Sequence, residues 1–428
     1  MRIAFICPVF PPEPAPAGVM AMQLARALAL DGHEVNVFTQ FPNRPQGKVF
    51  PGYRRQLRSI ERIDGFDVVR CPNWLLDRGR RWWNRVFENI TFGLSSLLNI
   101  WRAGRPDIVI LETWPIIATD LIVRLCRHWQ TPVLMYVQDC YPEALEYTGH
   151  IAIGGYLARI LRRWDGDICR RSTQIVVISD GMKRLLCRTR NIPEEKVSVI
   201  ANWIDSRHFP AFERDNAWRR EAGIAKEKFL VLFAGTLGHV SGAEVLVDVS
   251  RNLAHRPDVS FVCVGEGALK ESMEHQASAA GLQRLLFLPF QSSERVAEMH
   301  AAADATILTT QAGYPDASVP SKLIAYLAAG RPVVCAAQEL STVAQIVREA
   351  NAGVLAEPGN GDSIAEAIAF LADHPEESKQ MGENARWYFE NNLTFECAYR
   401  EFTAILEKEA QASSLQQRMA NRASSLSS

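Results

Sequence analysis

The sequence lacks the clustered cysteines and histidines that would hold a metal ion. Its 9 cysteines are an odd number scattered along 428 residues, and no two of them stand in a CxxC spacing. Scattered cysteines of this kind are typical of reduced thiols in a cytoplasmic protein. We therefore expect neither a metal site nor a disulfide framework.

The sequence also lacks an excess of charge of one sign and a long hydrophobic run. Its 47 Lys and Arg residues nearly balance 48 Asp and Glu residues, which excludes a strongly basic protein that binds nucleic acid. The stretch nearest to a membrane span, residues 108–125, carries Glu112 and Asp120. Prolines follow the apolar start of the chain at once, unlike in a signal peptide. We expect no nucleic-acid partner and no transmembrane segment.

What the sequence does contain is an alternation of apolar runs with helical stretches, over a length that suggests two or three domains. In the first half the runs predict buried strands at residues 3–9, 34–39, 68–71, 108–111, 133–138 and 175–178. Continuous apolar strands separated by helices indicate a parallel sheet that is covered on both faces.

The same alternation restarts in the second half. Strands are expected at residues 229–233, 261–264, 285–288, 305–308 and 332–335, again with helices between them. The pattern predicts two doubly wound α/β domains, over residues 1–205 and 206–385. Residues 386–410 should form a helix that packs back toward the N-terminal domain, and residues 411–428 a disordered tail.

The loops after the strands of the second half are rich in glycine, and ligands of open α/β sheets bind at such loops. Glycine allows backbone N–H groups to approach a phosphate closely. The expected donor-binding residues are Gly235, Thr236, Gly238, His239, Gly265, Glu266, Gly267, Pro320 and Ser321. Lys322 is expected to neutralise a leaving diphosphate, and Ser321 to cap the helix that begins there. Because turns use glycine everywhere, a purely structural role for these loops stays open.

In the first half, a proline-rich loop over residues 11–18 leads into a helix and contains Glu13 and Gly18. Asp139 directly follows an expected strand, where a carboxylate can act on a hydroxyl group or orient a sugar. Glu143 follows four residues later. We expect Asp139 to be catalytic and Glu13, Gly18 and Glu143 to bind the acceptor, although Asp139 can equally cap a helix or form a turn.

A basic and aromatic segment precedes the expected strand at residue 108. It contains Arg78, Arg80, Arg81, Trp82, Trp83 and Arg85, with further basic and aromatic residues at 162–171. Arginine next to tryptophan suits the headgroup region of an anionic bilayer. We expect membrane contact here, and the alternative is an ordinary amphipathic helix packed on the sheet.

Short motifs occur in a fixed order along nearly the whole chain. They are Pro-Pro-Glu at 11–13, Gly-His-Glu-Val at 32–35, Val-Gln-Asp at 137–139, Asn-Trp-Ile-Asp at 202–205, Ala-Gly-Thr-Leu-Gly at 234–238 and Val-Pro-Ser-Lys at 319–322. In this order the chain resembles family 4 of the retaining glycosyltransferases. Within that family it is similar to bacterial O-antigen and colanic-acid enzymes such as L-fucosamine transferase.

The resemblance implies the GT-B fold, with two Rossmann-like domains facing across a cleft. It implies a nucleotide-diphosphate sugar, UDP- or GDP-linked, in the C-terminal half, and a lipid-linked saccharide acceptor in the N-terminal half. It also implies retention of the anomeric configuration without a metal ion. The enzyme would act on the inner face of the cell membrane, in the synthesis of surface polysaccharides. One departure is Ala325, which stands where many members carry a glutamate for the donor ribose.

Three other functions compete with this one. A nucleotide-sugar 2-epimerase shares the architecture but needs no acceptor, and a non-catalytic scaffold of a polysaccharide assembly complex needs no donor site. A dehydrogenase is disfavoured, because the sequence has no GxGxxG after the first strand and carries Thr39-Gln40 where an acidic residue would hold a ribose.

Overall fold

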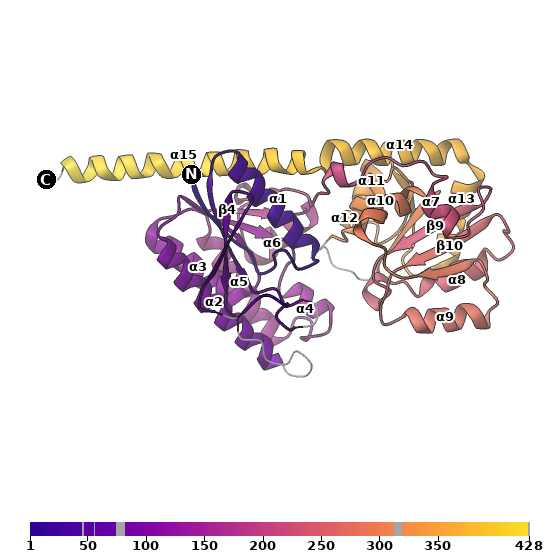
Figure 1. Ribbon diagram of the computed structural model, residues 1–428, viewed down its shortest axis with the longest axis horizontal. Coiled ribbons are helices and arrows are strands. Elements are labelled where there is room, and N and C mark those ends of the chain that lie inside the picture. The colour runs from indigo at the N-terminus through magenta and orange to yellow at the C-terminus, as the bar shows by residue number, and fades with distance from the viewer. Residues whose placement is uncertain (45–46, 55, 74–81, 312–318, 427–428) are drawn as a thin grey trace. The chain divides into compact units, whose positions relative to one another are not determined.

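The structure is a computed structural model that describes residues 1–428 except 45–46, 55, 74–81, 312–318 and 427–428. Contacts divide the chain into two compact units (Figure 1). The first unit comprises residues 1–200 and 399–428, and the second comprises residues 201–398. The first boundary therefore lies after Ile200, a few residues before the expected position after residue 205.

The first unit contains an eight-stranded sheet in the order β3-β4-β2-β1-β5-β6-β7-β8. Its strands are β1 (Arg2–Ile6), β2 (Glu34–Gln40), β3 (Ser59–Ile63), β4 (Phe66–Cys71), β5 (Ile108–Glu112), β6 (Val133–Val137), β7 (Gln174–Val177) and β8 (Val197–Val199). All neighbours are parallel except β3 and β4. The edge strands β3 and β8 were not expected from the sequence, because β3 is half exposed and β8 is only 3 residues long.

Helices cover both faces of this sheet, which explains why its central strands are apolar throughout. They are α1 (Pro16–Leu30), α2 (Trp82–Ala103), α3 (Ile116–Trp129), the short α4 (Glu143–Tyr147), α5 (Tyr156–Arg171) and α6 (Asp180–Arg190). Figure 1 shows α1 on one face and α2 with α3 on the other. Every residue of β5 and β6 is buried between these layers.

The second unit contains a six-stranded parallel sheet in the order β11-β10-β9-β12-β13-β14. Its strands are β9 (Phe229–Ala234), β10 (Val259–Val264), β11 (Leu285–Leu288), β12 (Ala305–Thr309), β13 (Val333–Ala336) and β14 (Gly353–Ala356). Alternate residues of β9 enter separate cores on the two faces: Leu230 and Leu232 lie in one, Val231 and Phe233 in the other. The doubly wound sheet expected for each half is therefore confirmed.

Helices also cover both faces of the second sheet. They are α7 (Ala217–Glu221), α8 (Val245–Asn252), α9 (Lys270–Ala279), α10 (Ser293–Ala301), α11 (Lys322–Ala328), α12 (Thr342–Glu349), α13 (Gly361–Asp373) and α14 (Pro375–Asn392). Helix α14 packs closely on α11. A Cβ atom on Gly382 of α14 would lie 2.5 Å from the carbonyl oxygen of Gly330, so glycine is required at this approach.

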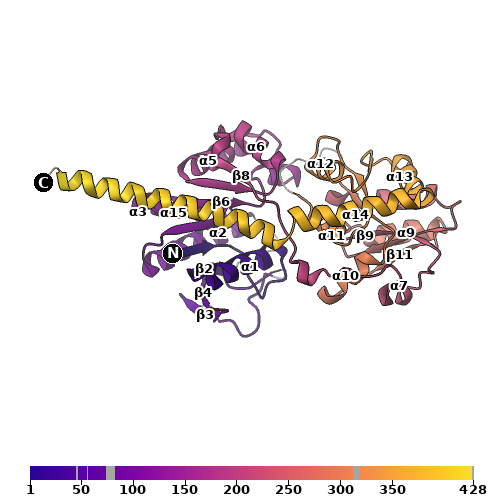
Figure 2. The ribbon, with the colours of Figure 1, turned by 90° about the horizontal axis from the view of Figure 1, so that it is seen from above.

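The C-terminal part differs from the expected single helix and disordered tail. After α14, a second helix, α15 (Phe395–Leu426), continues well beyond residue 410 (Figure 2). Its sequence is rich in Ala, Gln, Glu and Leu, which all favour helix. Within the first unit, the ring of Phe402 packs edge-on against that of buried Tyr136, with centroids 5.3 Å apart. In the described part of the chain, no helix is long and apolar enough to cross a membrane.

Candidate functional site

The two glycine-rich loops of the second unit lie side by side at the carboxyl ends of β9 and β10. The N–H of Gly235 donates to the carbonyl of Val264 at 2.9 Å, and the N–H of Leu237 donates to the carbonyl of Glu266 at 2.9 Å. These bonds extend the strand pairing into the loops. This edge of a parallel sheet is where α/β domains bind ligands.

The glycines of the second loop are explained by this packing. A Cβ atom on Gly265, whose φ is +153°, would lie 1.9 Å from the carbonyl oxygen of Gly235. A Cβ atom on Gly267 would lie 2.1 Å from that of Leu237. Both residues are therefore glycine because backbone meets backbone here. Their expected contact with a phosphate stays a prediction.

Lys322 lies at the start of α11 with its side chain folded over these loops. Its Nζ atom is enclosed, and among the residues that the structure describes it has no hydrogen-bond partner. It lies 4.1 Å from the centroid of the Phe233 ring, and a Cβ atom on Gly235 would be 3.6 Å from it. Burial lowers the pKa of Lys322 to about 8. A desolvated ammonium group without a counter-ion is costly, and a bound anion would remove that cost.

The expected cap at Ser321 is wrong. Ser321 occupies the position before α11, but no cap hydrogen bond of its side chain is seen in the described structure. Its φ of −61° and ψ of −22° are helical, whereas a capping serine needs an extended backbone. The carbonyl of Pro320 instead accepts from the N–H of Leu323 at 3.2 Å. Ala325 packs against the hydrophobic core of this unit.

Two polar residues that were expected to bind the sugar donor instead pair with neighbouring side chains on the protein surface. A carboxylate oxygen of Glu266 lies 2.7 Å from Nζ of Lys270. Nδ1 of His239 is 3.8 Å from a carboxylate oxygen of Glu244, which is an ion pair only when the imidazole is protonated. Both residues remain largely exposed, so neither is fixed toward the edge that holds Lys322.

Thr236 and Gly238 shape the first loop through their backbones. The carbonyl groups of both accept hydrogen bonds from the Ser241 hydroxyl, at 2.9 Å and 2.7 Å. The Thr236 side chain is exposed. The loop thus has a defined backbone, and the structure shows no side chain in it that carries a positive charge apart from His239 when protonated.

In the first unit, Asp139 follows β6 as predicted. Its side chain is exposed, but enough protein surrounds the carboxyl group for desolvation to raise its pKa. The stacked rings of Trp114 and Tyr141, with centroids 4.5 Å apart, belong to the loops after β5 and β6. Asp139 therefore belongs to the ligand-binding edge of this sheet.

Glu143 was expected to bind the acceptor, but its side chain is held in ion pairs within the first unit. Its carboxylate is buried and accepts hydrogen bonds from the guanidinium group of Arg190, with the Nη2–Oε2 distance 2.7 Å, and from Arg162 at 2.8 Å. Hydrogen bonds from these arginines, working against burial, lower the pKa of Glu143 to about 2. Arg190 also donates to Asp165 at 2.9 Å and to the carbonyl of Tyr141 at 2.6 Å. Glu143 thus fastens the loop that carries Asp139 to α5 and α6.

Glu13 and Gly18 also make structural contacts. The Oε1 atom of buried Glu13 accepts from the N–H groups of Asn43 and Arg44 at 2.7 Å and 2.8 Å, which joins two loops. A Cβ atom on Gly18 would lie 3.2 Å from Cα of Phe10, so glycine allows α1 to start close to the loop after β1. Acceptor binding by these residues stays a prediction.

The sequence reasoning missed two polar residues at the same edge. Glu112 ends β5, is 7% exposed, and has no described partner for its Oε1 atom. Burial raises the pKa of Glu112 to about 8. The Nε2 atom of Gln138, next to Asp139, is likewise enclosed and without a partner in the described structure. The only signal in the sequence was an acidic residue at the end of an otherwise apolar run.

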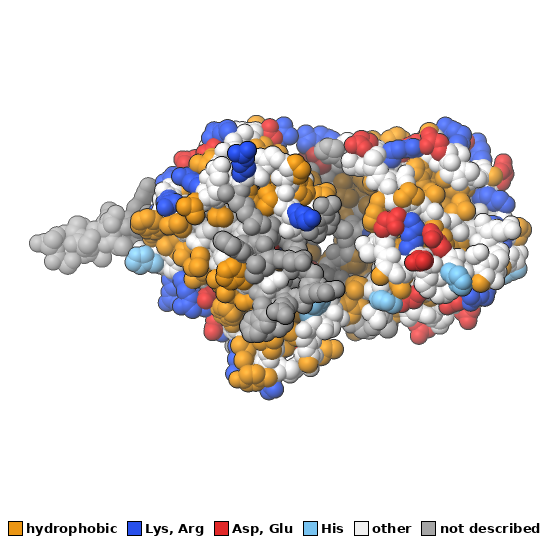
Figure 3. Space-filling model, turned by 60° about the horizontal axis from the view of Figure 1, so that its bottom comes forward, with side chains coloured by type: hydrophobic (Ala, Val, Ile, Leu, Met, Phe, Trp, Pro, Cys, Tyr) orange, Lys and Arg blue, Asp and Glu red, His pale blue; other side chains and the backbone are white. Residues whose placement is uncertain are grey.

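The residues expected at the membrane are incompletely described. Arg78, Arg80 and Arg81 lie outside the described residues, and so do the side chains of Trp82, Trp83 and Arg85 at the start of α2. In the second basic group, Arg162 and Arg171 are held in ion pairs with Glu143, Glu146 and Asp120. Figure 3 shows hydrophobic side chains beside Lys and Arg side chains on the surface of the first unit.

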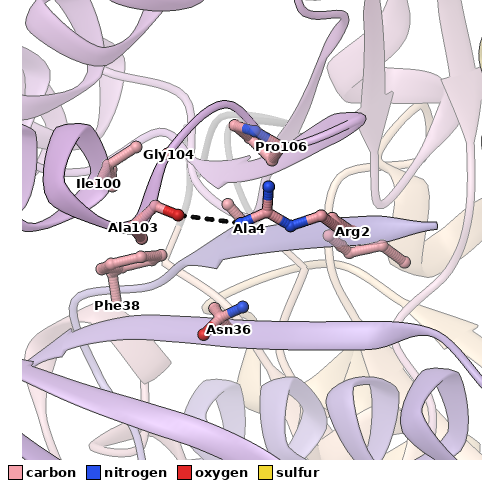
Figure 4. Close-up of a pocket in the computed structure, with 9 residues that line it drawn as sticks. Arg2, Ala4, Asn36, Phe38, Ile100, Ala103, Gly104 and Pro106 are labelled. Carbon is pink, nitrogen blue, oxygen red and sulfur yellow. Dashed lines mark hydrogen bonds between the residues drawn. The ribbon is translucent and has the colours of Figure 1, made fainter.

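Two cavities lie away from the edges described above. One, of about 10 Å³, is lined by Arg2, Asn36 and Phe38 (Figure 4). Arg2 donates there to the carbonyl of Ala103 at 2.9 Å, and the space is too small for a sugar. The other, of about 470 Å³, is lined by residues at the N-terminal ends of β9, β12 and β13 and by residues of α13 and α14, so it lies at the opposite edge of the second sheet from Lys322.

Comparisons with known proteins match both halves of the chain. Residues 17–203 match the family model described as glycosyl transferase 4-like domain, and residues 214–387 match the model described as glycosyl transferases group 1. A putative colanic acid biosynthesis glycosyl transferase of Escherichia coli K12, WcaI, is 24% identical over 401 residues, which cover 92% of this chain and 96% of that protein.

Solved structures share the fold at low identity. The sucrose-phosphate synthase of Thermosynechococcus elongatus aligns with a TM-score of 0.76 at 17% identity, covering 96% of this chain and 100% of that one. HepE of Anabaena, in complex with UDP, aligns with a TM-score of 0.70 at 16% identity, covering 95% of this chain and 100% of that one.

The Arg190 ion pairs predict a large loss of stability for Arg190→Ala. The variant leaves the Glu143 carboxylate buried without its main partner, which costs about 3–5 kcal/mol in the free energy of unfolding. Arg188→Ala, at an exposed position of the same helix, should change it by less than about 0.5 kcal/mol. Urea unfolding, with hydrogen exchange of β6 and β7 to follow the first unit, measures both. Equal transition midpoints for the two variants would contradict the assignment.

Lys322→Met should preserve or raise the stability of the second unit, because it removes an unpaired buried charge. The native lysine binds its proton less tightly when folded, with a pKa of about 8 against 10.5. The unfolded chain therefore holds more protons between these values, and the wild-type protein gains stability from this group as the pH rises through that window. Thermal unfolding from pH 7 to pH 10 should show a smaller gain in the methionine variant. Identical pH slopes would show that Lys322 is not desolvated.

Proposed function

Because this chain is a glycosyltransferase with the GT-B fold, we propose that it transfers a sugar from a nucleotide-diphosphate sugar to a saccharide acceptor, with retention of configuration. The donor binds to the second unit at the edge formed by β9, β10 and the start of α11. The observation that carries this assignment is the enclosed ammonium group of Lys322, which has no partner among the described residues. A diphosphate supplies the missing negative charge.

The chemistry follows from that charge. As the bond between the anomeric carbon and the diphosphate oxygen breaks, negative charge grows on the diphosphate, and Lys322 stabilises it from a site already shielded from water. The acceptor hydroxyl forms the new bond on the same face of the sugar, and its proton passes to the departing diphosphate. Asp139 orients that hydroxyl group. No metal ion takes part in the proposed reaction, and the protein acts mainly by positioning.

The identity of the donor is supported by fold likeness. HepE, which shares this fold, was solved with UDP bound, and a second HepE structure contains UDP-glucose. UDP- and GDP-sugars are therefore the first donors to test. WcaI is named for colanic acid biosynthesis, which supports a bacterial surface polysaccharide as the product. We propose a saccharide on polyprenyl diphosphate as the acceptor.

A lipid-linked acceptor requires the enzyme to reach the inner face of the membrane, and α5 offers a surface for this. Tyr156, Leu157 and Ile160 lie on one side of α5, and Ile153 precedes the helix; the four side chains are between 42% and 84% exposed. Exposed Arg159 and Arg163 border them. Apolar side chains next to arginines suit the headgroup region of an anionic bilayer. We propose that this surface, the α5 face, binds the membrane.

Separate measurements of donor binding and of sugar transfer distinguish the roles of Lys322 and Asp139. Calorimetric titration with UDP-, GDP-, ADP- and dTDP-sugars identifies the donor, and Lys322→Met should weaken its binding at least tenfold. Asp139→Asn should bind the donor normally but release nucleoside diphosphate at least tenfold more slowly with bacterial polyprenyl-linked saccharides as acceptors.

Turnover of the donor by the wild-type protein without any acceptor would instead indicate an epimerase. Unchanged binding and unchanged transfer in both variants would remove this site from the reaction.

The α5 face predicts binding to anionic vesicles. The wild-type protein should float with vesicles of phosphatidylglycerol and phosphatidylethanolamine, and Ile153→Ser combined with Leu157→Ser and Ile160→Ser should float several-fold less. Leu340→Ser, at an exposed leucine of the second unit, is the control and should float like the wild type. Equal flotation of the triple variant and the control would mean that the α5 face is not the membrane contact.

A further inference from the structure

The last residue of β5 is a buried glutamate, Glu112, with one carboxyl oxygen that has no hydrogen-bond partner among the described residues. Glu112 is 7% exposed, and no described residue forms a hydrogen bond with its Oε1 atom. A buried acceptor or donor left unsatisfied costs about 1–3 kcal/mol. β5 lies between β1 and β6 in the middle of the sheet, so Glu112 stands at the centre of the edge where parallel sheets bind ligands.

The surroundings of Glu112 keep its carboxyl group neutral. Burial raises its pKa to about 8, and the positive charge of Arg44 offsets this only in part. Among the described residues, the Cys7 thiol and the Tyr136 phenol also interact with it, and burial raises the pKa values of both. At neutral pH Glu112 is thus mainly a carboxylic acid, which can donate one hydrogen bond and accept others.

Gln138 places a second unsatisfied group on the neighbouring strand end. Glu112 pairs in register with Tyr136 of β6, and Gln138 follows Tyr136 by two residues, directly before Asp139. Its Nε2 atom is a buried donor with no described acceptor. Two unpaired polar groups on adjacent strands, neither of them charged, match a ligand that presents several hydroxyl groups.

We propose that Glu112 and Gln138 form a subsite that binds hydroxyl groups of one sugar ring of the acceptor. This inference rests on the proposed function, and it assigns the subsite to residues other than Glu13 and Glu143, whose carboxylates are already occupied within the first unit. Glu112 and Gln138 are positioning residues for the acceptor, and exposed Asp139 directly follows Gln138 in the chain.

The test uses simple sugars as probes, because they bind to such a subsite without a lipid. Methyl glycosides of glucose, galactose, mannose and N-acetylglucosamine are titrated into the full-length protein by saturation-transfer NMR. At least one should bind to the wild type. Glu112→Leu, which fills the volume with an apolar group, and Gln138→Leu should each weaken its binding at least tenfold, whereas Glu112→Gln should remain within about threefold.

Matched controls separate this subsite from stability and from the donor site. Glu34→Leu changes an exposed glutamate at the opposite end of the same sheet and should leave glycoside binding unchanged. Binding of the nucleotide donor should be unchanged in Glu112→Leu, and its melting temperature should not fall.

The outcomes of this experiment are distinct. Glycoside binding that is absent in the wild type, or equal in the wild type and Glu112→Leu, overturns the subsite, and the unsatisfied groups then hold only water. If the wild type bound no nucleotide sugar, the proposed function would be overturned instead.

Discussion

Buried polar groups that find no hydrogen-bond partner in the described structure are the constraint on which both halves of this protein depend. The Lys322 ammonium group in the second unit and the Glu112 carboxyl group in the first are each enclosed at the carboxyl edge of a parallel sheet. Their burial is unfavourable by itself, and it persists because the apolar strands behind them are covered by helices on both faces. The two groups differ in charge at neutral pH: Lys322 is positively charged, and Glu112 is largely neutral. That difference suits an anionic donor at one edge and an uncharged sugar at the other.

The parallel sheets could be predicted because buried central strands are apolar along their whole length. β5 and β6 stand out for this reason, and their predicted and observed bounds differ by a residue at most. Three of the four edge strands, β3, β8 and β14, could not be predicted in the same way. β3 alternates between half-buried and exposed residues, and β14 has 4 residues that begin with a glycine. The helix α15 was cut short in the prediction because its polar composition resembles that of a disordered tail.

The site was predicted less well than the fold, for a physical reason. A carboxylate in a loop looks the same in the sequence whether it binds a ligand or a distant arginine. Glu143 finds Arg190, 47 residues away, and Glu13 finds backbone groups of a separate loop. Glu112 was overlooked for the opposite reason, because its Oε1 atom has no described hydrogen-bond partner and the residue simply ends an apolar strand. Lys322 was found from a motif, but only the structure shows that its Nζ atom has no hydrogen-bond partner among the described residues.

The contact between the two glycine loops has a consequence for how this protein can diverge. The backbone at Gly235 occupies the place that any side chain on Gly265 would need, and Leu237 does the same to Gly267. A substitution at one position therefore cannot be accommodated by changing a neighbouring side chain, since the obstacle is main chain. Natural variants that replace Gly265 must also carry insertions or deletions that reroute the loop after β9. Relatives with loops of equal length should keep glycine at both positions, whatever sugar they transfer.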